Sequence, residues 1–148
     1  MSASDSFENA ILLLLYNNTA FAKIGDAAGL QPSAGAGSLY VSLHTADPGE
    51  AGDQTTSECA YTGYARVAVA RSGAGWTVAA EVVSNAAAVT FGACTAGPET
   101  ATHFGVGTDA AGAGVLLFSA ALDDSLDITD APSITPSFAI GALDNTVA

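Results

Sequence analysis

The chain has 148 residues, which suits one domain that can bury roughly 70% of the surface its unfolded form would expose. Three Lys and Arg residues stand against 15 Asp and Glu residues, so the formal net charge is −12. Such a surface repels phosphate backbones and anionic lipid headgroups. We therefore expect neither a nucleic-acid partner nor a membrane partner.

Residues 4–18 predict a helix, because Asp5 and Glu8 have the spacing of a capping box and the apolar residues recur at helical steps. Further leucines widen the apolar stripe beyond a simple amphipathic face. Two interpretations stay open: the helix is buried in the core on more than one side, or part of it meets a second subunit. The candidate interface residues are Phe7, Ile11, Leu12, Leu14 and Leu15.

The longest apolar run of this segment, residues 10–15, is far shorter than the roughly 20 residues that span a bilayer. No basic region precedes it, so we expect neither a transmembrane segment nor a signal peptide. Cys59 and Cys94 are too few for a disulfide scaffold and lack the C-x-x-C spacing of a metal or redox site. Two free thiols are expected, with one disulfide as the alternative.

Residues 25–38 are rich in Gly and Ala and predict a loop. Residues 39–44 then alternate at period two, and Asp47-Pro48-Gly49 ends that strand with turn residues. We expect a helix and arm over 1–24, the loop over 25–38, and a β-sandwich over 39–148, all within a single domain.

The rest of the chain predicts short strands separated by Gly, Asn, Asp or Pro. This spacing is typical of a sandwich or barrel rather than of βαβ units. The predicted fold is mainly β, an antiparallel β-sandwich of jelly-roll or immunoglobulin-like type with one N-terminal α-helix. Residues 109–114 predict a hairpin loop, and the acidic residues of 123–127 would blunt a strand edge. The expected strands are 65–71, 76–80, 82–84, 87–91, 103–107, 115–121, 126–128 and 137–140.

Few residues indicate catalysis. His44 and His103 are the two histidines, and Ser42 shares a strand face with His44, but a pair two residues apart on one strand has poor geometry for proton transfer. We therefore expect no catalytic residues and no enzyme.

Acidic residues gather in two loops without the order and distal Glu of a calcium loop, so we expect solvated loops, no metal and no cofactor. These residues are Asp47, Glu50 and Asp53 in one loop, and Asp123, Asp124, Asp127 and Asp130 in the other. Tyr61 and Tyr64 flank Gly63 at a loop end and form a candidate ligand-contact loop, because aromatic faces stack on sugar rings.

Four blocks occur in a characteristic order: LYVSLHTADPG at 39–49, GYARVAV at 63–69, VSNAAAVTF at 83–91, and THFGVG at 102–107 followed by GVLLF at 114–118. Together they resemble a family of small tailed-phage virion proteins described as tail-fibre-like or capsid-decoration proteins. The resemblance implies that His44 makes hydrogen bonds within the strand-to-turn segment.

The resemblance also implies a non-enzymatic structural protein located in the virion and assembled in the host cytoplasm. We expect a capsid decoration or cement protein that stabilises the head, because the short chain has no repeat-rich shaft. The expected partners are the major capsid protein or another virion protein, together with further copies of the chain in a homo-oligomer, with a trimer favoured. The alternative is a tail-fibre-like or minor tail protein, or a module that binds a carbohydrate or receptor.

Overall fold

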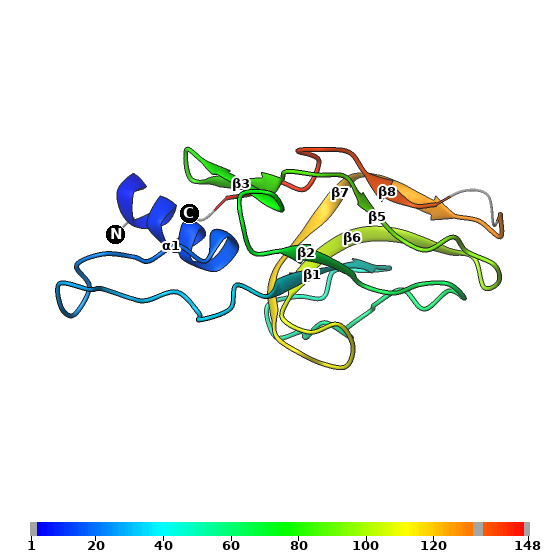
Figure 1. Ribbon diagram of the computed structural model, residues 1–148. Helices are drawn as coiled ribbons and strands as arrows, with labels where there is room; N and C mark the ends of the chain where they lie inside the picture. The colour runs from blue at the N-terminus through cyan, green and yellow to red at the C-terminus, as the bar shows by residue number, and fades with distance from the viewer. Residues whose placement is uncertain (1–2, 132–134, 147–148) are drawn as a thin grey trace. The chain divides into compact units, whose positions relative to one another are not determined.

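The computed structural model describes residues 3–131 and 135–146 (Figure 1). These residues form one helix and nine strands in antiparallel sheets, which confirms the predicted fold class. The ends of the predicted segments, residues 1–2 and 147–148, lie outside the described residues. Within the described ranges, no helix has the length and apolar character needed to cross a membrane.

The chain divides into two compact units. Unit 1 combines Met1–Ser38 with Val69–Ala88 and Ala139–Ala148, and unit 2 combines Leu39–Ala68 with Val89–Phe138. The segments Val69–Ala88 and Ala139–Ala148, which were predicted to belong to the β-sandwich, therefore group with the helix.

Unit 1 contains helix α1, Asp5–Asn17. The predicted capping box is wrong: Ser4 is the N-cap, and its carbonyl oxygen accepts hydrogen bonds from the N–H groups of Phe7 and Glu8 at 2.8 and 3.0 Å. No side chain of the described residues therefore caps the N-terminus of the helix, and the Ser4 carbonyl accepts the first hydrogen bonds of the helix itself. At its other end, Asn18 adopts the left-handed conformation with φ 53°.

Helix α1 packs against the sheet β3-β4-β9, formed by Trp76–Ala79, Val82–Asn85 and Asn145–Thr146. Tyr16 and Trp76 meet edge to face with ring centroids 4.9 Å apart. Leu12 is also fully buried, so this residue belongs to the core of unit 1. Strand β9 was not predicted.

The β3–β4 hairpin turns at Ala80 and Glu81. Both residues have positive φ, which gives a two-residue turn the same twist as the two strands that it joins. Asn9 of α1 holds this turn with two hydrogen bonds. Its Oδ1 accepts from the Glu81 N–H at 3.2 Å, and its Nδ2 donates to Glu81 Oε1 at 3.1 Å.

Arg71 holds the C-terminal end of α1. Its Nε donates to the Leu15 carbonyl at 2.6 Å, and Nη2 donates to the Leu14 carbonyl at 2.8 Å. Nη1 donates to the Ala36 carbonyl at 3.1 Å. The last turn of α1 has no basic residue of its own, so Arg71 provides the positive charge that favours a helix C-terminus.

Unit 2 contains most of a four-stranded sheet with the order β2-β1-β6-β7 (Figure 1). Strand β7 is continuous, although the sequence predicted two separate strands there. The acidic residues between the two predicted strands are accommodated by an irregularity in the pairing of β7 with β6. The strands are β1 Ser38–His44, β2 Val67–Ala70, β6 Glu99–Gly107 and β7 Leu116–Ile128.

A two-stranded ribbon forms the second layer of unit 2. Strands β5, Val89–Thr90, and β8, Ser137–Phe138, pair antiparallel. The Phe138 ring lies 6.1 Å from that of Phe104 on β6 and 6.0 Å from that of Phe91. These aromatic contacts fix the ribbon on the apolar face of the sheet.

We expect Arg71→Gln to lower the free energy of unfolding by about 2 kcal/mol, because it removes charge-assisted hydrogen bonds to helix carbonyls. Urea denaturation followed by far-ultraviolet circular dichroism measures the change. Lys23→Gln, on an exposed residue of the arm, is the matched control. An equal effect of both variants would show that Arg71 does not stabilise the helix.

Candidate functional site

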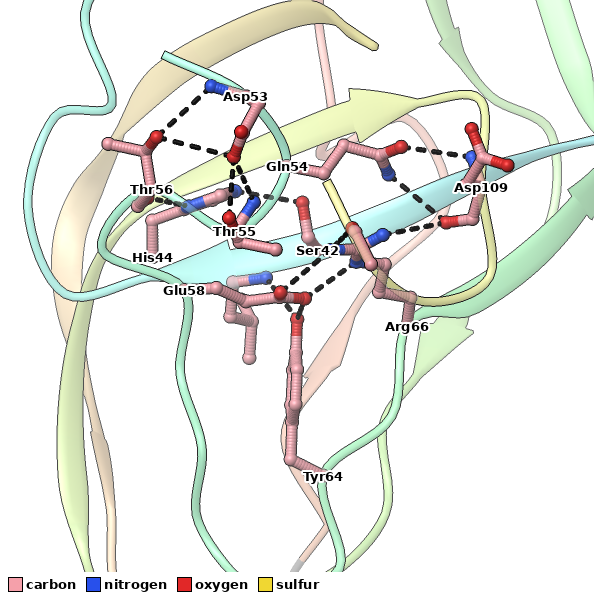
Figure 2. A network of polar contacts seen from close by, with 12 residues as sticks. Ser42, His44, Asp53, Gln54, Thr55, Thr56, Glu58, Tyr64, Arg66 and Asp109 are labelled. Atoms are coloured by element: carbon pink, nitrogen blue, oxygen red, sulfur yellow. Dashed lines mark hydrogen bonds and ion pairs between the residues drawn. The ribbon is translucent and has the colours of Figure 1, made fainter. Parts of the chain in front are cut away.

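A network of buried polar side chains lies where β1 ends (Figure 2). Ser42 and His44 are both fully buried. The Nε2 of His44 lies 2.8 Å from Ser42 Oγ, and its Nδ1 lies 2.8 Å from the carbonyl oxygen of Thr56. His44 therefore joins β1 to the loop that follows it.

The hydrogen-bond partners fix the form of the His44 ring. A carbonyl oxygen only accepts, so Nδ1 carries the proton that is shared with Thr56, and in the neutral ring Nε2 accepts from the Ser42 hydroxyl. Burial lowers the pKa of His44 below its usual 6.5, which favours this neutral ring. Because both side chains are enclosed, the pair serves to position the loop.

Glu58 and Arg66 form a buried bidentate ion pair beside this histidine. Nε of Arg66 donates to Glu58 Oε1 at 2.7 Å, and Nη2 donates to Oε2 at 2.8 Å. Only 2% of the Arg66 side chain and 15% of the Glu58 side chain are exposed. The hydrogen bonds that Arg66 donates to the Glu58 carboxylate raise the pKa of Arg66, so its charge is permanent.

Tyr64 connects the ion pair to β1. Its hydroxyl donates to Glu58 Oε1 at 2.8 Å and accepts from the Leu43 N–H at 3.1 Å. Burial raises the pKa of Tyr64, so the hydroxyl keeps the proton that it donates.

Arg66 and Gln54 together hold the hairpin loop between β6 and β7. Arg66 donates to the carbonyl oxygens of Asp109 at 2.9 Å and Gly112 at 2.8 Å. The Gln54 amide donates to the Asp109 carbonyl at 3.2 Å and accepts from its N–H at 2.9 Å. Gln54 is fully buried against Gly107, where a Cβ would collide with its side chain.

The carboxylate of Asp53 is used within its own loop. Its Oδ1 accepts from the N–H of Thr55 at 2.8 Å and from its hydroxyl at 2.6 Å, and these bonds lower the pKa of Asp53. Asp47 caps its turn in the same way, accepting from the Gly49 N–H at 2.9 Å. In the part of the chain that the structure describes, no three His, Cys, Asp or Glu residues are grouped as metal ligands would be.

The two tyrosines of the candidate ligand-contact loop differ in how accessible their side chains are to solvent. Tyr61 is 3% exposed and donates its hydroxyl to the Gly92 carbonyl at 3.0 Å, so its ring is a core residue. Tyr64 lies 5.3 Å from Tyr61, ring to ring, and lines a hollow of about 340 Å³ with Ala65 and Ala111 among others. Only Tyr64 therefore borders open space.

Cys59 and Cys94 are buried free thiols, as predicted. Burial raises the pKa of the Cys59 thiol to about 12, so it is not a reactive thiolate at neutral pH.

The helix residues proposed as interface candidates also differ in how far they are buried. Leu12 is enclosed, as described above, whereas Phe7 is 43% exposed. Ile11, Leu14 and Leu15 are half-buried. The structure thus leaves Phe7 as the candidate with the most accessible surface.

The sequence did not single out Glu58, Gln54 or Arg66. One signal was present: the chain has only three basic residues, so an arginine within the GYARVAV block was unusual. Its partners could not be found from spacing, because Asp109 and Gly112 come from a distant hairpin.

Removing one member of the buried ion pair leaves the other charge uncompensated. We therefore expect Arg66→Met to lower the free energy of unfolding by about 3–5 kcal/mol. Arg66→Lys keeps the charge but loses the planar fork, and should also be destabilising, by a smaller amount. Urea denaturation of both variants measures the costs. A cost for Arg66→Met of under about 1 kcal/mol would contradict the role of this pair.

His44 should make stability depend on pH. Its pKa is lowered in the folded state, so below pH 6.5 the unfolded chain binds more protons and the free energy of unfolding falls as pH falls. We expect the difference in unfolding free energy between wild type and His44→Gln to shrink between about pH 8 and pH 5. The NMR titration of the His44 ring should show a midpoint below 6.5; a higher midpoint would refute the assignment.

Comparison with known proteins agrees with the virion resemblance. A family model described as podophage GP4 fiber I protein gp80 matches residues 2–146, nearly the whole chain. No curated protein matches the chain. The family supports a phage virion structural protein, as the sequence predicted. The chain therefore belongs to the phage family of the podophage GP4 fiber I protein gp80.

Proposed function

We propose that the protein is a non-enzymatic component of a phage fibre, and that it functions through its interfaces with other virion proteins. The observation that carries this proposal is the family match, which covers residues 2–146 and is described as a fiber protein. The polar network supports it, because Ser42 and His44 are enclosed and their hydrogen bonds stabilise a loop.

Capsid decoration is the second candidate function. The resemblance of the sequence blocks between residues 39 and 118 to virion proteins that include capsid-decoration proteins favours it, and the partner would then be the major capsid protein. The family description favours a fibre over this candidate.

For either location we propose a homo-oligomer, with a trimer favoured, that assembles through the arm surface. We define the arm surface as Phe7, Phe21, Ile24 and Leu30. The backbones of Phe21 and Leu30 exchange two hydrogen bonds of 2.9 Å, which puts their side chains on one face, and Phe7 lies 5.7 Å from Phe21, ring to ring. Ile24 and Leu30 are 38% and 41% exposed. Exposed apolar side chains of this size favour a protein partner.

Cryo-electron microscopy of particles that carry the protein tests the location, with its copy number measured against the major capsid protein. A small number of copies at the tail would support the fibre assignment. A regular lattice of copies on the head would overturn it and establish decoration.

The arm surface is tested by replacing Phe7 and Leu30 with Ser. We expect this double variant to be monomeric by size-exclusion chromatography with light scattering, while its circular dichroism stays that of the wild type, because these side chains are exposed. Ala27→Ser, on an exposed residue of the same arm, is the control. Leu12→Asp should instead unfold unit 1, because it places a charge in the core. An unchanged oligomer in the double variant would exclude the arm surface as the interface.

A further inference from the structure

Strand β7 is the last strand of the sheet order, and its two halves are built differently. The register passes from Ala101 opposite Leu126 to His103 opposite Ala121, so residues 122–125 form a bulge opposite Thr102. This half also carries exposed aspartates at 123, 124 and 127. Bulges and charges are the devices by which edge strands avoid pairing with other chains.

The other half of the strand, residues 116–121, has no charged residue. Its side chains are half-buried from Leu116 to Ala120. Within the described residues, the sheet order places only β6 beside it. The pairing of this half with β6 has a smaller irregularity of its own, since Val106 lies opposite Phe118 and Gly107 opposite Leu116. What this part of the edge lacks is the charge that the aspartates give to residues 122–127.

A groove of about 420 Å³ lies along this uncharged half. One side is formed by residues 116–119 of β7, and the other by Asp47, Gly49, Glu50 and Gly52 of the loop after β1. The groove thus combines an edge strand, leucine side chains and two carboxylates.

The loop side of the groove is held in place before any partner arrives. The Asp47 carboxylate caps the turn, and the Gly52 N–H donates to the Gly49 carbonyl at 3.1 Å. A side chain at Gly52 would collide with the Pro48 carbonyl, so the backbone packs closely there. Gln54, which follows this segment, is fully buried. A preformed groove lowers the entropic cost of binding an extended segment.

We propose that an extended segment of a different virion protein adds as a strand to residues 116–121 of β7 and places a Lys or Arg between Asp47 and Glu50. The charge of the groove favours a basic segment. A second copy of this chain does not supply one. Arg66 and Arg71 are committed to internal bonds, and Lys23 lies in a turn with φ 69°, which an extended strand does not adopt.

This inference rests on the protein being part of the virion, at either the tail or the head. The test places a photo-crosslinking residue at Ser119 in phage assembled in cells, with the same residue at Asp124 as the matched control on the protected half of β7. Mass spectrometry of purified particles identifies the cross-linked peptides. We expect Ser119, but not Asp124, to cross-link to a Lys- or Arg-containing segment of another virion protein.

The charge of the groove is tested in the same particles. Asp47→Asn combined with Glu50→Gln should lower the Ser119 cross-link yield by about fivefold or more, while Asn still caps the turn. Cross-linking of Ser119 to β7 of a second copy would overturn the proposed partner. A yield no higher than that of Asp124 would overturn the site. Absence of the protein itself from purified particles would instead refute the virion assignment, so the two failures are distinguishable.

Discussion

Two guanidinium groups, that of the buried Arg66 and that of the half-buried Arg71, stabilise the fold, because each satisfies backbone carbonyls that the secondary structure leaves without partners. Arg71 binds the carbonyls at the end of α1, and Arg66 binds those of the β6–β7 hairpin loop. An unsatisfied buried carbonyl is costly, and a planar group with five donors can serve several at once. With only three basic residues in the chain, nearly all of its positive charge is used in this way.

The second constraint is the presence of two glycines, Gly105 and Gly107, on a central strand of the sheet. A Cβ at Gly105 would lie 2.7 Å from His44 Nε2 and from Ser42 Oγ, and one at Gly107 would collide with Gln54. Both glycines lie on β6, between β1 and β7. They let the loop after β1 and its polar side chains lie directly on the sheet. The network of Figure 2 and one side of the groove both depend on this close approach.

The sequence predicted the elements whose periodicity is strong. Helix α1 and strand β1 agree with their predicted ranges within a residue or two, because apolar side chains repeat at helical steps in one and alternate in the other. Strand β7 was predicted in two parts, since the run from Asp123 to Asp127 has the composition of a turn, and only the pairing with β6 makes it a bulged strand. The contacts of Arg66 were not predictable, because no local pattern brings a hairpin carbonyl to a guanidinium group.

The uncharged half of β7 has a consequence for how two copies of the chain interact. An uncharged edge strand with leucine side chains can pair with the same edge of another copy, and the repulsion between chains of net charge −12 opposes this. That repulsion acts over the Debye length, about 8 Å at physiological ionic strength and about 3 Å at 1 M. Salt therefore weakens the force that opposes edge-to-edge pairing between two copies of the chain.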